Sequence, residues 1–224
     1  ILVTGFQFAL KGYAVAQDRF VDFPASIEIV FWNWLIPLLS KYDFNFFSLF
    51  DFTYTKVWIL TLNILPLSLL FPSDFTLRVN LSVTITLVIV GGLNFLFPSL
   101  SPVYTFDLHY LPNNLKSIDV HSLSSKVTEN LIEGDFAALS PFAFQPISCF
   151  PSFHIAYTYL GTLFVREITH RIYIHLFVDA FLVCILIGSI VLGYHYLIDG
   201  LAGMAIAHLA YKITAKAMCL CTLE

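Results

Sequence analysis

Six long apolar runs, separated by polar breaks, most constrain what this chain can fold into. They cover about residues 1–17, 57–72, 80–98, 152–167, 172–194 and 198–217. A helix needs roughly 17–25 apolar residues to cross a bilayer, so the first two runs are short for spans. Of the 224 residues, 58% are hydrophobic and only 12% are charged, whereas soluble domains average about 25% charged residues. The sequence therefore predicts an all-α, polytopic membrane helical bundle of about six transmembrane helices, forming a single integral membrane domain over residues 1–224.

Two shorter apolar segments lie between the first and second runs. Residues 25–39 include Glu28, two Trp and a Pro, and residues 44–52 are rich in Phe. Trp residues and an occasional charge are typical of the membrane interface, so both segments are predicted to be helices that lie on the membrane surface. Residues 99–150 are predicted to form a long loop, with one helix around residues 124–133.

The distribution of basic residues predicts the orientation of the bundle. Five of them fall near the connections at one end: Arg78, Arg166, Arg171, Lys212 and Lys216. Cytoplasmic connections carry an excess of Lys and Arg, so that end is predicted to be cytoplasmic. The opposite end is then non-cytoplasmic, meaning periplasmic, extracellular or lumenal. The net charge of −4 and the lack of a basic run in the sequence argue against a nucleic-acid partner.

Two polar motifs interrupt the apolar pattern at that second end. "PSFH" (151–154) opens the fourth run, and "GYHYLIDGLAG" (193–203) lies between the fifth and sixth runs. His195 and Asp199 are four residues apart, so they share one face of a helix. His195 follows His154 by 41 residues, which is the length of one span out and one span back. The three side chains are therefore predicted to meet at one membrane surface.

These residue types suit phosphoryl transfer through a phosphohistidine. A carboxylate bonded to one imidazole nitrogen fixes the tautomer and leaves the other nitrogen nucleophilic. A second histidine can protonate a leaving group. Pro151 and Ser152 open the fourth span, where backbone N–H groups and the helix dipole favour an anion. No metal ion or organic cofactor is expected in such a reaction.

The two motifs resemble the second and third motifs of the type 2 phosphatidic acid phosphatase superfamily. "NFLFPSLSPVY" (94–104) is similar to the Pro-rich segment of its inositol phosphorylceramide synthase-like branch, and the resemblance covers about residues 55–217. It implies six spans with the site on the non-cytoplasmic side. It also implies that His195 is the nucleophile, Asp199 its partner, and His154 the acid that protonates the leaving oxygen.

Two departures from the phosphatase pattern bear on the substrate. The sequence has no Lys-x6-Arg-Pro motif, and Gly188 and Ser189 stand where the phosphatases carry a Ser-Arg pair. Both missing cations bind phosphate oxygens. A phosphomonoester carries nearly two charges and a diester one, so their loss penalises the monoester more. This favours a phosphotransferase that moves a head group from a phospholipid donor to a lipid alcohol such as ceramide, although Lys116 or Lys126 in the loop is an alternative source of positive charge.

Four residues are predicted to contact substrate: Ser152, Tyr194, Tyr104 and Lys116. Each has a structural alternative. Ser152 is equally well explained as an ordinary helix N-cap. Tyr194, with Tyr196, is typical of an interface anchor, and Tyr104 of packing. The head group, the acceptor, an accessory subunit and the oligomeric state stay open.

Two other functions remain as alternatives. The first is a lipid phosphate phosphatase, which would hydrolyse phosphatidic acid or a polyprenyl phosphate with the same three residues. The second is a transporter or channel, in which His175 and Asp179 would extend a proton relay toward the site. His175 and Asp179 are four residues apart within the fifth run, and an internal hydrogen-bonded pair is the simpler interpretation.

Overall fold

A computed structural model of the chain describes residues 23–56, 64–112, 115 and 150–221. All regular secondary structure in this part of the chain is helical. The helices are α2 (Phe23–Leu39), α3 (Phe44–Lys56), α4 (Ile64–Ser68), α5 (Ser73–Leu96), α6 (Pro102–Thr105), α8 (Phe153–Ile168), α9 (Ile172–Val191) and α10 (Leu197–Cys221). The predicted span 1–17, the first part of the predicted span 57–72 and the predicted loop helix 124–133 lie outside the described residues.

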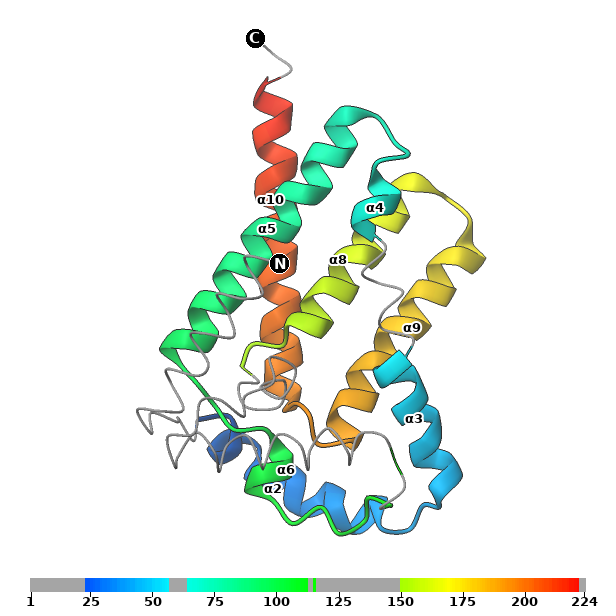
Figure 1. Cartoon of the computed structure of the whole chain (residues 1–224), viewed down its shortest axis with the longest axis vertical. Coiled ribbons are helices and arrows are strands. Elements are labelled where there is room, and N and C mark those ends of the chain that lie inside the picture. The colour runs from blue at the N-terminus through cyan, green and yellow to red at the C-terminus, as the bar shows by residue number, and fades with distance from the viewer. Residues whose placement is uncertain (1–22, 57–63, 113–114, 116–149, 222–224) are drawn as a thin grey trace, which may run out of the picture.

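Helices α5, α8, α9 and α10 form a bundle along the long axis of the molecule (Figure 1). Helix α10 packs against α5 and α8, and α8 also packs against α9. Between α5, α8 and α10 lies a buried apolar cluster, which consists of Val79, Val83, Val90, Ala156, Tyr157, Leu160, Phe164 and Ala207. Two of the described helices, α5 and α9, are long and apolar enough to cross a membrane. The fold is thus all-helical and consistent with a membrane protein.

The last three apolar runs fold as predicted, since α8, α9 and α10 each begin within one residue of the predicted start. The prediction was less accurate for α5, which begins at Ser73 rather than at residue 80. Pro72 precedes the helix and Asp74 lies in its first turn, where a carboxylate interacts favourably with the helix dipole. The early start places Arg78 inside the helix and not in a connection.

The described part of the predicted span 57–72 is not one continuous helix. Helix α4 ends at Ser68, and the chain then turns, with Leu69 N donating to Pro66 O (3.2 Å) and Phe71 N to Ser68 O (3.1 Å). Pro72 lacks a backbone N–H, and its ring would clash with the carbonyl of Ser68 in a continuous helix, which explains the turn at this point. Helix α4 packs against α5.

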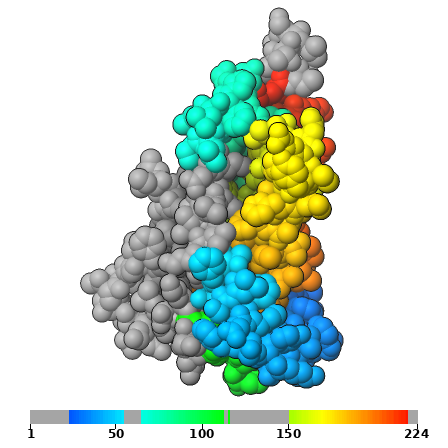
Figure 2. All heavy atoms as spheres, turned by 90° about the vertical axis from the view of Figure 1, so that its right-hand side faces the viewer, coloured from blue at the N-terminus to red at the C-terminus, as the bar shows by residue number. Residues whose placement is uncertain are grey.

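Helices α2 and α3 surround the lower end of the bundle in Figure 1. Helix α2 lies across this end and buries Trp32 completely; its predicted position on the membrane surface stays a prediction. Helix α3 was predicted to lie on the surface too, but instead it packs lengthwise against α9 (Figures 1 and 2). Its Phe47 is fully buried, and Gly188 of α9 allows Phe50 to approach closely. The Phe-rich pattern therefore reflects helix–helix packing.

A polar cluster joins α5, α8 and α10 toward the other end of the bundle. Arg78 Nη1 donates to Glu167 Oε2 (2.8 Å), Arg78 Nη2 donates to Glu167 Oε1, and the Tyr211 hydroxyl donates to the same carboxylate. The guanidinium of Arg78 also lies over the rings of Phe164 (5.4 Å) and Tyr211 (4.7 Å). Arg78 thus holds three helices together in addition to contributing positive charge.

We expect Arg78→Ala to lower the free energy of unfolding by about 1–2 kcal/mol, because it removes a two-bond ion pair with Glu167 and the cation that lies over two aromatic rings. Reversible unfolding in mixed dodecyl maltoside–SDS micelles measures the change. Arg171→Ala is the matched control, since the exposed Arg171 side chain donates to the hydroxyl of exposed Tyr173; its cost should stay below about 1 kcal/mol. Equal losses in both variants would contradict the role of Arg78.

Candidate active site

The start of α8 is tied to the neighbouring helices by its first residues. Ser152 is the N-cap: its Oγ accepts from Ile155 N (3.4 Å), and its own N–H donates to Asp199 O (3.0 Å). Asn94 Nδ2, near the end of α5, donates to Pro151 O (3.4 Å). Ser152 is 1% exposed, which matches the alternative interpretation as a cap. These bonds fix His154 in the first turn of α8.

The turn between α9 and α10 is held by backbone hydrogen bonds. The N–H groups of Tyr194 and His195 both donate to Ser189 O, at 2.9 and 3.1 Å. Gly193 has a φ of +73°, which favours glycine, and a Cβ there would lie 2.3 Å from Leu108 Cδ1. Its carbonyl accepts from Val103 N of α6 (3.2 Å). The Pro-rich segment after α5 therefore packs directly against the histidine-bearing turn.

His195 and Asp199 face each other inside this turn. His195 Nδ1 lies 3.5 Å from Asp199 Oδ2, and the same oxygen accepts from Tyr196 N (2.8 Å). The two residues are 6% and 0% exposed. Within the described part of the chain, neither His195 Nδ1 nor Asp199 Oδ1 has a further hydrogen-bond partner. Because Nδ1 faces the carboxylate, Nε2 is the ring nitrogen left for chemistry.

The structure brings the three predicted catalytic residues together at the lower end of the bundle. The ring centroids of His154 and His195 are 6.1 Å apart, and Asp199 lies behind His195. Gly203 of α10 makes this approach feasible, because a Cβ there would lie 2.4 Å from Ser152 O. The three side chains therefore lie close together, as their spacing in the sequence predicted. Their catalytic roles stay a prediction.

The residues predicted to contact substrate have different surroundings. Tyr194 is 6% exposed, and its ring stacks on Tyr54 at 4.7 Å between centroids. Tyr104 lies in α6, next to the Val103 N–H that binds the turn. Tyr196 packs inward, with its hydroxyl donating to Thr105 Oγ1 (3.0 Å). Lys116 lies outside the described residues, as does Lys126.

His175 and Asp179 do not form the predicted internal pair. Arg166 Nη2 donates to both oxygens of Asp179, at 2.8 and 2.6 Å, and His175 Nε2 lies 2.7 Å from Thr169 O. Arg166 competes successfully because a guanidinium binds both carboxylate oxygens at once. His175 lies about 24 Å along the helix from the end of α9, so His175 and Asp179 are both far from His195.

Sequence reasoning missed two residues that contact the site, Tyr54 and Glu28. The Tyr54 hydroxyl lies 3.4 Å from His154 Nδ1. Glu28 accepts from Leu197 N (3.0 Å) and Ile198 N (2.6 Å) and so caps α10 from a different helix. The signal for Glu28 was present, because a carboxylate in an apolar segment is costly unless it is paired. Tyr54 carried no such signal in a segment full of aromatic residues.

The cationic side chains of α5, α8, α9 and α10 lie away from this site. Arg166 and Arg171 flank the connection from α8 to α9, and Arg78 binds Glu167 near the end of α8. Lys212 lies about 20 Å along α10 from Asp199.

No group of three or more His, Cys, Asp or Glu side chains that suits a metal ion occurs among the residues that the structure describes.

A protein-family model described as the PAP2 superfamily matches residues 19–213. The chain belongs to this superfamily, whose members are generally phosphoesterases, and membership suggests phosphatase or phosphotransferase activity on lipid phosphates. The match begins before α2, so α2 and α3 fall within the family region along with the two histidine motifs. No curated protein and no solved structure shows significant similarity to the chain.

Glu28 makes the stability of the protein depend on pH in a way that can be tested. Burial raises the pKa of Glu28 above its ordinary value of 4.5, against the effect of the two backbone N–H donors. The folded protein therefore binds this proton more tightly than the unfolded chain does. The contribution of Glu28 to stability is full below pH 4.5 and is lost as the pH rises through the raised pKa.

We expect the melting temperature of the wild type, relative to that of Glu28→Gln, to fall as the pH is raised from about 4 to about 7. Scanning fluorimetry of both proteins in detergent at matched pH values measures this difference. The melting temperature of the wild type relative to that of Glu28→Ala, which also lacks the titrating group, should fall with pH in the same way. A difference that stays constant with pH would mean that Glu28 binds its proton equally in the folded and unfolded states.

Proposed function

We propose that this protein is a multi-pass membrane phosphotransferase that moves a phospho-head group from a phospholipid to an acceptor alcohol through a phosphohistidine. The observation that carries the proposal is the pair of facing histidines, 6.1 Å apart between ring centroids, with Asp199 behind one of them. By the charge distribution of the sequence, the site faces the non-cytoplasmic side. The acceptor is a lipid alcohol, with ceramide one member of that class.

In the first step His195 Nε2 attacks the phosphorus of the donor, and the bond from phosphorus to the diacylglycerol oxygen breaks. His154, protonated at Nε2, donates a proton to that departing oxygen. Asp199 keeps the proton on His195 Nδ1 and stabilises the positive charge that the ring gains. The products are free diacylglycerol and a phosphohistidine that carries the head group.

In the second step the hydroxyl of the acceptor attacks the phosphohistidine. His154, now neutral, takes the proton of that hydroxyl as the new oxygen–phosphorus bond forms. The nitrogen–phosphorus bond breaks, and His195 returns to its starting state. With water in place of the alcohol the same steps would describe a phosphatase, so the acceptor defines the reaction.

The packing around Gly188 and Ser189 supports a diester donor. A Cβ at Gly188 would already lie 3.4 Å from Phe50 Cδ1, and Ser189 is fully buried with its hydroxyl donating to Leu186 O (2.8 Å). These are the positions where the phosphatase pattern carries its Ser-Arg pair. Ser189 stands at the arginine's position, and because it is fully buried the present packing leaves no room for a long cationic side chain there. A donor with one phosphate charge needs this cation less than a monoester with two.

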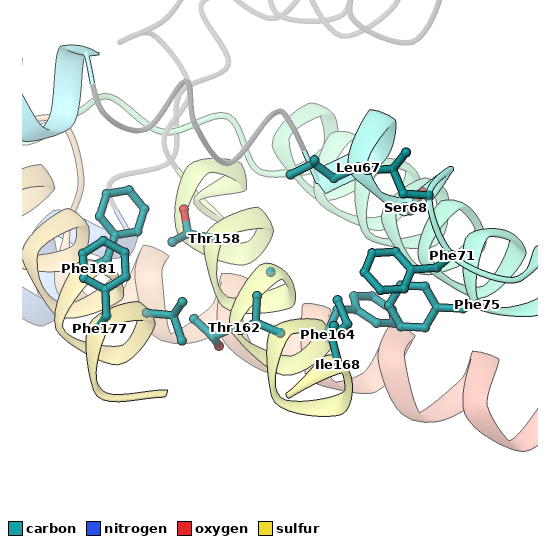
Figure 3. A pocket seen from close by; sticks show the side chains of 14 residues that line it. Leu67, Ser68, Phe71, Phe75, Thr158, Thr162, Phe164, Ile168, Phe177 and Phe181 are labelled. Atoms are coloured by element: carbon teal, nitrogen blue, oxygen red, sulfur yellow. The ribbon is translucent and has the colours of Figure 1, made fainter. Parts of the chain in front are cut away.

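An apolar cavity of about 420 Å³ supports a lipid substrate (Figure 3). It lies beside α8 and is bounded by α4, α5 and α9, with Phe71, Phe75, Phe177 and Phe181 among its lining residues. Thr158, at its edge, donates from its hydroxyl to His154 O (2.8 Å). The cavity therefore begins about one helical turn from the reacting histidine, as a lipid chain attached to a bound head group requires.

We expect Val178→Trp, which fills part of this cavity from α9, to raise the KM for a long-chain phospholipid donor about 10-fold, equivalent to the loss of about two buried methylene groups. The KM for a dihexanoyl donor should change little. Val183→Trp is the matched control, because Val183 lies on α9 but is 49% exposed. Equal effects on both donors would show that the cavity does not hold the lipid chain.

The main test is product analysis with purified protein in detergent. We expect fluorescent phosphatidylinositol plus a lipid alcohol to give acceptor-dependent transfer, and His195→Ala to lower the rate more than about 10³-fold because the nucleophile is lost. Acid-labile incorporation of the labelled head group into the wild type would report the phosphohistidine.

His208→Ala is the matched control, because His208 lies on the exposed face of α10 with its Nδ1 3.3 Å from the Tyr159 hydroxyl. Its transfer rate should stay near that of the wild type. Free phosphate from phosphatidic acid, without transfer from phosphatidylinositol, would overturn the transferase in favour of a phosphatase.

A further inference from the structure

We infer that Tyr54 of α3 is a positioning residue that orients His154 as the acid of the reaction. This inference rests on the proposed function, because it assigns a role to a neighbour of one of its reacting groups. The Tyr54 hydroxyl lies 3.4 Å from His154 Nδ1, and the two ring centroids are 5.5 Å apart. Tyr54 is outside both histidine motifs and about a hundred residues earlier in the chain.

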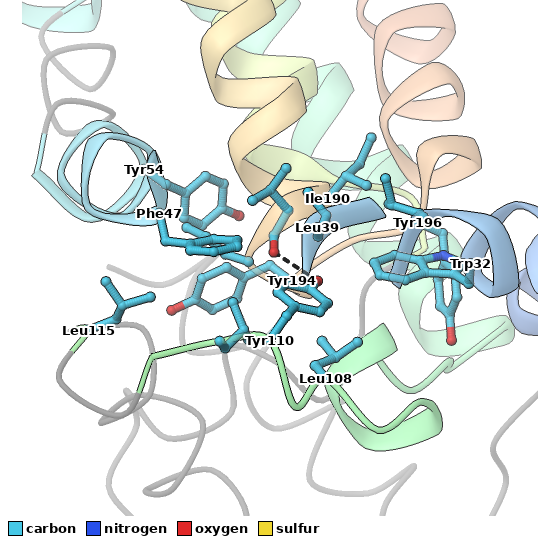
Figure 4. Close-up of a cluster of buried hydrophobic side chains, with 14 of the residues drawn as sticks. Trp32, Leu39, Phe47, Tyr54, Leu108, Tyr110, Leu115, Ile190, Tyr194 and Tyr196 are labelled. Atoms are coloured by element: carbon cyan, nitrogen blue, oxygen red, sulfur yellow. Dashed lines mark hydrogen bonds between the residues drawn. The ribbon is translucent and has the colours of Figure 1, made fainter. Parts of the chain in front are cut away.

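Tyr54 is held in place by packing on its other side. Its ring stacks on Tyr194 at 4.7 Å between centroids with an interplanar angle of 19°, and it is 5% exposed. Figure 4 shows Tyr54 and Tyr194 side by side, within the cluster that also contains Phe47 and Tyr110. Tyr194 directly precedes His195, so Tyr54 contacts both His154 and the neighbour of His195 in the chain.

The chemistry of the imidazole explains what this hydroxyl contributes. A protonated His154 carries N–H groups at both ring nitrogens. When Nδ1–H donates to the Tyr54 oxygen, the ring is fixed with Nε2–H on the side opposite this bond, where the proposed reaction places the leaving oxygen. After proton transfer the same bond keeps the remaining proton on Nδ1, so that Nε2 accepts the proton of the attacking alcohol. Tyr54 thus acts on His154 as Asp199 acts on His195.

The test uses Tyr54→Phe, which keeps the stacked ring and removes only the hydroxyl. With phosphatidylinositol as donor the leaving group is an alkoxide that needs a proton, so we expect kcat to fall about 10- to 100-fold, part of the roughly 10²–10⁴-fold that a general acid contributes. KM should change little. With hexadecyl p-nitrophenyl phosphate the leaving group departs as a stable anion, so the loss should be below about 3-fold.

Tyr110→Phe is the matched control, because it removes a buried hydroxyl that donates to Val191 O (2.9 Å) in the same cluster. A purely structural effect should lower the rates with both donors by one common factor in this variant. The inference is overturned if Tyr54→Phe behaves in the same way, with no difference between the two leaving groups. If instead the wild type cleaves neither donor, the proposed function itself fails, and the role of Tyr54 in that reaction fails with it.

Discussion

Asp199 makes the contacts on which the rest of the site depends. Its carbonyl accepts from the N–H of Ser152, its carboxylate accepts from Tyr196 N, and the same carboxylate oxygen faces His195 Nδ1. One residue therefore joins the start of α8 to the start of α10 and orients an imidazole. A buried carboxylate is costly unless its partners compensate, so the approach of the two helix ends and the position of His195 are coupled. Substituting Asp199 would remove the carboxylate contacts with Tyr196 N and His195, but it would leave the backbone carbonyl that accepts from Ser152.

The start of α10 is stabilised by a second carboxylate from outside the bundle. Glu28 of α2 accepts from two N–H groups in the first turn, and Asp199 lies in the same turn, so two acidic groups share one helix N-terminus. Their mutual repulsion is offset by the positive end of the helix dipole. Trp32, one turn further along α2, stacks on Phe106 and meets Tyr196 edge to face. The surface helix α2 thereby positions the histidine-bearing turn.

The sequence predicted best what depends on local pattern. Helices α8, α9 and α10 follow from apolar runs, and the meeting of His154 with His195 follows from their separation by two helix lengths. The early start of α5 was missed because an arginine is typical of a connection between spans. Its pairing with Glu167 of α8 offsets the cost of placing this charge within a helix of the bundle. The contacts of Glu28 and Tyr54 are with partners a hundred or more residues away, which local pattern does not identify.

The packing of α3 links the fold to the proposed choice of substrate. Bringing Phe50 against Gly188 places Tyr54 beside His154, and Ser189, the next residue of α9, is fully buried where the phosphatase pattern carries its arginine. In the proposed reaction α3 thus supplies a hydroxyl to the acid, while the buried Ser189 leaves the nucleophile without that cation. A phosphate with a single charge needs less compensation in the bound state, whereas its alkoxide leaving group still needs a well-oriented proton donor. The missing cation therefore favours a diester donor over a monoester, whereas the acid that Tyr54 orients serves the alkoxide leaving group of either donor.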